Sequence, residues 1–340
     1  MTFNEWTSLP DGFSEAAATE LFRFSQQPIL FHLPGRKTRP LFLTILLHGN
    51  EDTGWRALQL VLKKYQGREL PRRLSVFVGN ISAAAAKVRR LDGQIDYNRV
   101  WPGTPMGETA EAALMAQVVR RMQMLDPFAF IDIHNNTGVN PYYACVSEVS
   151  AANLYLARLF SRIAVYFRTP PGTAAAAMNT ICPSITVECG KAGQTAGDEH
   201  AARLIDAALH LDHFPETDHT THDVEVYHTV ATVKIPADVS LAFGDQSAGV
   251  SFPAHFDEWN FRELEAGTLF AHAQTERPLE VTDENGKSNF DEFFTQQGDE
   301  IRLARRAMPA MITLNERVIR QDCLCYLMER YRTQSRQPRA

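Results

Sequence analysis

Residues 40–215 alternate between short apolar segments and longer segments of helical character, and this alternation limits the folds open to the chain. The strand-like segments are 41–47, 74–80, 129–133 and 184–188, and the helical ones are 55–65, 109–125, 151–167 and 198–211. Strands and helices in alternation at this spacing predict an α/β fold, with a mostly parallel central sheet and helices on both faces. The segment LFLTILL (41–47) is apolar on both sides, which indicates a central strand buried on both faces.

The character of the chain changes after Phe214-Pro215. The next segment, HDVEVYHTVATVKIP, alternates like a strand, and turn-rich sequence with further short strands follows it. We therefore expect a first domain over residues 1–215, a smaller β-rich domain over 216–330, and a polar tail over 331–340.

Composition narrows the class of partner. The chain of 340 residues has a formal net charge of −6, and its Lys and Arg residues are not concentrated in one segment of the first 300, which argues against a nucleic-acid partner. No apolar run has the length of a signal peptide core or a membrane span. The five cysteines are odd in number and lack CxxC spacing, as in a reduced protein. These features predict a cytoplasmic protein without a nucleic-acid or membrane partner, and they leave a homo-oligomer open.

Chemically active residues follow the predicted strands. His48 and Glu51 come directly after the first strand, His134 follows the third, and Glu188 ends the fourth. The loop after the second strand contains RRLDGQIDYNR. Because ligands of open parallel sheets bind beyond the carboxyl ends of the strands, we expect these side chains to gather at one edge of the sheet.

The residue types at this edge predict a zinc site. A catalytic zinc takes three protein ligands from His and carboxylate and keeps one position open. His48 and Glu51, separated by a Gly-Asn turn, can point to one side, and His134 would join them from another strand. Glu188 could serve as the general base. A single histidine at a strand end is usually structural, so the prediction depends on the convergence of all four residues.

Four motifs occur in an order that resembles a known family. HGNE, DYNR with an arginine just upstream, DIHNNTG and VECG follow one another as in the succinylglutamate desuccinylase/aspartoacylase family of the zinc carboxypeptidase superfamily. The resemblance covers residues 40–215 well and the C-terminal half more loosely. It implies that residues 1–215 form a zinc-dependent catalytic domain that hydrolyses an amide bond in a small carboxylate-bearing substrate, with an N-acyl amino acid as the expected substrate class.

The resemblance also implies roles for individual residues. His48, Glu51 and His134 would bind one zinc ion, and Glu188 would activate the water and carry its proton. Asn98 and Arg99 would grip the carboxylate of the substrate, a task that suits a planar guanidinium.

Two further residues are implied by the same resemblance. An upstream arginine would stabilise the oxyanion, and it is placed at Arg90, with Arg89 as the alternative. Asp96 would hydrogen-bond a histidine ligand of the zinc from behind.

Two other functions use the same residues. One is a metallocarboxypeptidase that acts on short or modified peptides, and the other is a non-catalytic zinc-binding module.

One position departs from the family, whose C-terminal domain contributes a tyrosine to the substrate site. Phe293 or Phe294 falls at that position here, which predicts a preference for less polar substrates, with Tyr326 or Tyr331 as alternative donors of the hydroxyl.

Overall fold

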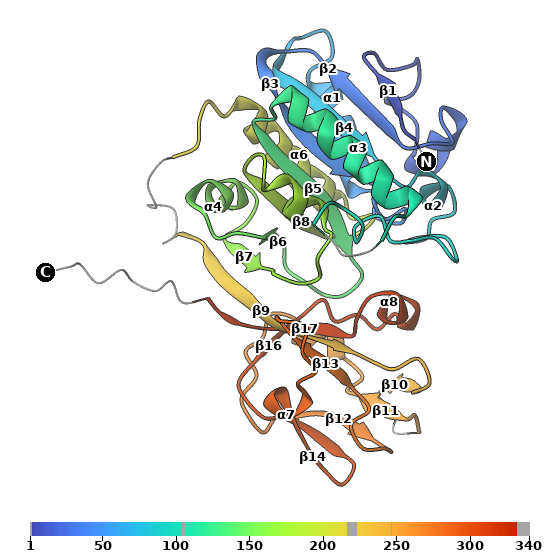
Figure 1. Ribbon diagram of the computed structural model, residues 1–340, viewed down its shortest axis with the longest axis vertical. Helices are drawn as coiled ribbons and strands as arrows, with labels where there is room; N and C mark the ends of the chain where they lie inside the picture. Colours follow the sequence, from blue (N-terminus) through green and yellow to red (C-terminus); the bar gives the residue numbers. More distant parts are fainter. Residues whose placement is uncertain (1, 104–106, 216–222, 246, 332–340) are drawn as a thin grey trace, which may run out of the picture.

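The computed structural model describes residues 2–103, 107–215, 223–245 and 247–331. Figure 1 shows the first half of the chain, a sheet with its helices, in the upper part of the molecule and the β-rich C-terminal half below it. The helices are α1 (Thr53–Lys64), α2 (Ile81–Ala85), α3 (Ala110–Leu125), α4 (Ala151–Arg158), α5 (Ala174–Met178), α6 (Thr195–His210), α7 (Phe290–Phe293) and α8 (Glu316–Gln321), with the 3-10 helices η1 (Ala18–Arg23) and η3 (Phe256–Trp259).

Twelve of the described strands form one sheet, in the order β1-β2-β4-β3-β5-β8-β6-β7-β9-β17-β16, with β13 paired to β9. Their bounds are β1 (Asn4–Trp6), β2 (Ile29–Leu33), β3 (Gly35–Ile45), β4 (Leu70–Val78), β5 (Ala129–Asn136), β6 (Tyr143–Val146), β7 (Ile163–Tyr166), β8 (Ser184–Lys191), β9 (Glu225–Lys234), β13 (Glu280–Asp283), β16 (Met308–Ala310) and β17 (Cys325–Arg330). The four strands predicted between residues 41 and 188 are its central members, and β4, β3, β5 and β8 run parallel to one another. The predicted fold class is confirmed.

Helices cover both faces of this sheet. The side chains of a strand alternate between the two faces, so a strand that is apolar throughout needs a helix layer on each side. In β3, Leu41, Leu43 and Ile45 belong to the core that includes residues of α1, α4 and α6. Phe42, on the opposite face, belongs to the core that includes residues of α3 and α5. The near-continuous apolar run of β3 is therefore explained by burial on both faces.

One predicted element differs from the structure. The segment 151–167 is predicted as one helix, but α4 ends at Arg158 and residues 163–166 form the strand β7. In this strand β-branched Ile163 and Val165 alternate with Ala164 and Tyr166, and β7 lies between β6 and β9. Pairing on both sides therefore outweighs the helical character of the longer segment.

The C-terminal half contributes to both sheets. β9, β13, β16 and β17 continue the central sheet, whereas β10 (Leu241–Phe243), β11 (Val250–Phe252), β12 (Leu269–Ala273), β14 (Phe294–Gln297) and β15 (Glu300–Leu303) form a five-stranded sheet of their own. Residues 216–222, at the predicted domain boundary, and 332–340, of the predicted tail, lie outside the described residues. Within the described ranges, no helix has both the length and the apolar character needed to cross a bilayer.

Candidate active site

The strand order brings the predicted site residues to one edge of the central sheet. β5 lies between β3 and β8, and all three are parallel, so their carboxyl ends share an edge. His134 lies in β5 opposite Glu188 in β8, and His48 and Glu51 lie in the turn between β3 and α1.

That turn is fixed by close packing against α2 and the loop after it. The amide of Gly49 donates a hydrogen bond to the Arg89 carbonyl, 3.1 Å away. A Cβ atom at Gly49 would overlap the backbone of Ala83 in α2, so glycine is required there by space. The HGNE motif is thus a tight turn whose glycine sets where His48 and Glu51 point.

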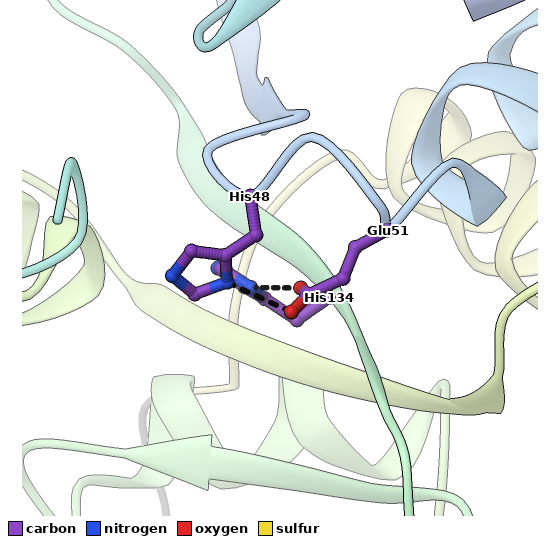
Figure 2. A group of neighbouring side chains, drawn as sticks. All are labelled: His48, Glu51 and His134. Atoms are coloured by element: carbon purple, nitrogen blue, oxygen red, sulfur yellow. Dashed lines mark hydrogen bonds and ion pairs between the residues drawn. The ribbon is translucent and has the colours of Figure 1, made fainter. Parts of the chain in front are cut away.

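His48, Glu51 and His134 converge on one point (Figure 2). Nδ1 of His48 lies 2.8 Å from one carboxylate oxygen of Glu51, and Nδ1 of His134 lies 2.7 Å from the other. All three side chains are buried, and one nitrogen or oxygen atom from each lies within 4.8 Å of the other two. Two imidazole nitrogens and a carboxylate form the donor set of a catalytic zinc site.

The opposite nitrogen of each imidazole also faces a carboxylate. Nε2 of His48 lies 3.0 Å from Asp96, and Nε2 of His134 lies 2.9 Å from Asp132. A neutral imidazole has a single N–H, so it cannot donate to carboxylates at both nitrogens. Although burial lowers the pKa of His134, Asp132 and Glu51 together raise it well above its ordinary value. A cation at the Nδ1 atoms would replace the extra protons, so these residues fit a metal ion.

Glu188 lies at the same edge with a free oxygen. Its Oε2 atom is buried and has no hydrogen-bond partner among the described residues. Burial raises the pKa of this carboxyl to about 7, with Glu51 adding to the effect and His134 opposing it. A carboxyl that titrates near neutral pH suits a group that takes up and releases a proton.

The structure brings Arg89, and not Arg90, to this cluster. Arg89 lies 3.5 Å from Glu51 and 3.0 Å from Asp96, and it lines the cavity beside the two histidines. Arg90 instead donates to the carbonyl of Gln94 at 2.8 Å and is not one of the described residues that line the cavity. The structure therefore places Arg89, the alternative, beside the cluster and Arg90 away from it, while the oxyanion role itself stays a prediction.

Asn98 and Arg99 both line the cavity, and each already has protein partners. The side-chain amide of Asn98 donates to Asp132 at 3.3 Å, and its oxygen accepts from the backbone N–H of Ala174 at 2.9 Å. Arg99 donates to the Asn98 carbonyl and to Asp322, both at 2.9 Å. In the DYNR motif, Asn98 thus hydrogen-bonds Asp132, the partner of His134, and Arg99 contacts Asp322 in the C-terminal half.

Sequence reasoning did not identify Asp132 and Asp322. Asp132 lies two residues before His134 on the same strand, and side chains at this spacing share a face, so the DIH sequence contained a usable signal. Asp322 follows α8, more than 200 residues after the arginines it contacts, and no local pattern marks it.

Contrary to expectation, Phe293 and Phe294 do not lie at the cavity, whereas the predicted preference for less polar substrates stays a prediction. Both side chains are buried in the core of the C-terminal sheet, and neither is among the described residues that line the cavity. Tyr326, one of the alternatives, lines the cavity, whereas Tyr331 does not. The reason is that Tyr326 lies in β17, which belongs to the central sheet, while Phe294 begins β14 of the other sheet.

These residues surround a cavity of about 380 Å³. The polar part of its lining includes the two histidines, Glu188, Asp322 and three arginines, Arg89, Arg99 and Arg168. Its other walls include the apolar side chains of Val146, Phe167, Pro170, Pro171, Ala175 and Ala176. The volume is that of a site for a small molecule.

Comparisons with known proteins agree with this geometry. Residues 37–213 match the family model described as the succinylglutamate desuccinylase/aspartoacylase catalytic domain. No curated protein matches the sequence.

Several solved structures are similar to most of the chain. The succinylglutamate desuccinylase from Chromobacterium violaceum superposes with a TM-score of 0.56 at 16% identity, over 88% of this chain and 87% of that one. A succinylglutamate desuccinylase/aspartoacylase from Rhodobacter sphaeroides gives 0.55 at 16%, over 88% of each chain. Murine aminoacylase 3 gives 0.54 at 16%, over 87% of this chain and 96% of that one. At such identities these likenesses establish a shared fold.

Proposed function

The chain belongs to the succinylglutamate desuccinylase/aspartoacylase family, a family of deacylases, and on that premise we propose that it is a zinc-dependent hydrolase of N-acyl amino acids. The reaction is cleavage of an amide bond in a small carboxylate-bearing substrate. The observation that supports it most directly is the convergence of His48, Glu51 and His134, buried together at the edge of a cavity.

His48, Glu51 and His134 would hold the zinc ion, with Asp96 and Asp132 orienting the two imidazoles from behind. When bound, zinc would supply Lewis-acid chemistry, which lowers the pKa of a water from 15.7 to about 7 and polarises a carbonyl group.

The remaining residues would guide the proton and the substrate. Glu188 accepts a proton from the attacking water on its unpartnered oxygen and later donates it to the leaving amine. Arg89 donates to the carbonyl oxygen as negative charge develops there. Arg99, adjoining Asn98, holds the carboxylate of the substrate.

The test pairs metal analysis with a substrate panel. The purified protein should contain about one zinc ion per chain, or rebind it after chelation. It should then hydrolyse members of a panel of N-acyl amino acids, with the chelated protein inactive. His48→Ala and His134→Ala each remove one of three ligands and should lose metal sharply. Full metal content in both variants would show that the assigned site is wrong.

A further inference from the structure

Asp322 lies between Arg89 and Arg99, two of the three arginines that line the described cavity. Its Oδ1 atom accepts a hydrogen bond from Arg99 at 2.9 Å, and its Oδ2 atom accepts one from Arg89 at 3.3 Å. The side chains of Arg89, Arg99 and Asp322 are 10%, 21% and 18% exposed, so water screens these ion pairs little. The carboxylate of a protein residue therefore lies where the guanidinium groups would attract the carboxylate of a ligand.

Asp322 is ionised in this setting. Burial raises the pKa of its carboxyl, but Arg99 and Arg89 more than offset this and lower it below its ordinary value. Arg89 and Arg99 carry two positive charges, and Asp96 and Asp322 supply two negative charges at hydrogen-bonding distance. The pair of guanidinium groups consequently offers no excess positive charge.

The third arginine of the cavity is also paired. Arg168 lies 3.3 Å from Glu284, and no lysine is found among the described residues that line the cavity. Each arginine lining the cavity thus has a protein carboxylate as partner. Apolar side chains such as Val146, Phe167 and Pro170 contribute other parts of the wall, where a charged group would lose its hydration.

We propose that Asp322 sets the charge specificity of the site, so that the preferred substrates are N-acyl amino acids with a single carboxylate. This inference rests on the proposed function. A guanidinium has five N–H donors, so Arg99 can bind one substrate carboxylate beside Asp322. A second carboxylate, on the acyl group or the side chain, meets like charge from Asp322 and finds no unpaired arginine in the described cavity. Discrimination then comes from a repulsive element built into the site.

The test uses two substrates of nearly equal shape that differ by one charge, N-acetylasparagine and N-acetylaspartate. The wild-type enzyme should have a kcat/KM for the asparagine compound at least about tenfold higher, since like charges brought together in a protein site disfavour binding strongly. Asp322→Asn keeps the shape and one acceptor but removes the charge. It should reduce this preference by about tenfold or more.

Two control variants separate charge from other effects. Asp322→Glu keeps the negative charge and should keep the wild-type preference. Asp92→Asn removes a charge from an exposed residue that pairs with Arg317 of α8 outside the cavity, at 3.2 Å, and should leave the preference unchanged.

The outcomes distinguish this inference from the proposed function. An active wild-type enzyme that prefers N-acetylaspartate overturns the inference, as does an Asp322→Asn variant with the wild-type preference. If that variant does not fold, the wild-type preference decides alone. Calorimetric binding of the products asparagine and aspartate to the zinc-loaded protein gives a readout without turnover. Tighter binding of asparagine by a protein that hydrolyses no N-acyl amino acid would support the charge selection and refute the proposed reaction.

Discussion

Glu188 is the residue whose removal separates metal binding from proton transfer. Glu188→Gln keeps the size and hydrogen-bonding capacity of the side chain but cannot accept a proton. We expect kcat to fall by about 10²- to 10⁴-fold, the usual contribution of a general acid or base. Zinc content should stay at the wild-type level, because Glu188 is not one of the three converging ligands. Steady-state kinetics with metal analysis checks both, and an active variant would eliminate this proton path.

Arg89 and Arg90 offer a matched pair, because they are neighbours in the chain with different surroundings. Arg89→Ala removes a donor directed at the cluster and should lower kcat by about 10²- to 10³-fold, as the loss of an oxyanion donor does. Arg90→Ala removes a hydrogen bond to the Gln94 carbonyl and should leave kcat within a few-fold. Measuring kcat for both variants decides which arginine acts on the carbonyl oxygen. A larger loss of kcat for Arg90→Ala than for Arg89→Ala would reverse the assignment.

The residues of the candidate site differ in how far sequence could predict them. His48 and Glu51 follow β3, and His134 and Glu188 lie near the carboxyl ends of β5 and β8. Because the order of these parallel strands places their ends together, the convergence was predictable. The choice between consecutive arginines was not, because the direction of a loop side chain depends on the backbone of the whole loop. A hydrogen-bond partner on the same strand can be predicted from local spacing, as for Asp132, which lies two residues before His134. A partner distant in the sequence, such as Asp322, cannot be predicted in this way.

The turn between β3 and α1 is the element on which the metal site depends. Gly49→Ala places a Cβ against the backbone of Ala83, and backbone cannot move aside as a flexible side chain can. We expect a loss of about 1–3 kcal/mol in the free energy of unfolding, the usual cost of overpacking, together with weaker zinc binding. Urea unfolding measures the first effect and metal titration the second.

Gly107→Ala is the control for this change, because a Cβ there meets no atom within 4 Å and its backbone is not in the left-handed region. It should unfold as the wild type does. If Gly49→Ala also matched the wild type in stability and zinc affinity, the turn would not be constrained as described.

Element prediction succeeded where one periodicity held over the whole segment. β3, β4, β5 and β8, with α1, α3 and α6 beside them, lie where apolar runs and helical spacing predicted them. It failed at 151–167, where an apolar segment continues without interruption from helix to strand. Whether such a segment turns into a strand depends on the strands available to pair with it, here β6 and β9, and this is information about the tertiary structure.

At the scale of the molecule, the two halves share a sheet. β9 pairs with β7 of the first half, and Asp322 joins Arg89 and Arg99 at the cavity. A fragment of residues 1–215 would expose the edge of β7 and lose Asp322 and Tyr326. We expect it to lack a cooperative urea transition and to bind zinc poorly. Urea unfolding followed by near-UV circular dichroism, together with zinc titration, on the fragment and the full chain checks both expectations. A cooperatively folded, zinc-binding fragment would contradict them.

The division into domains at residue 215 remains a prediction. The strands of the five-stranded sheet all come after the change in composition at this residue. What composition could not predict is that strands after the change belong to two different sheets. Pairing between β9 and β7 joins residues about 60 apart in the chain, and pairing between β9 and β17 joins residues about 100 apart. Over such separations a local pattern carries no information about the partner strand.

The two edge strands of the long sheet limit how far the sheet can pair with strands of another molecule. Its outermost strands, β1 and β16, each have three residues, and β16 includes Pro309, which has no backbone N–H. The Pro309 carbonyl already accepts a hydrogen bond from the amide of Phe261, at 2.8 Å. Short, interrupted margins of this kind give little template for adding a foreign strand. The long sheet should therefore resist growth into fibrils from these two margins.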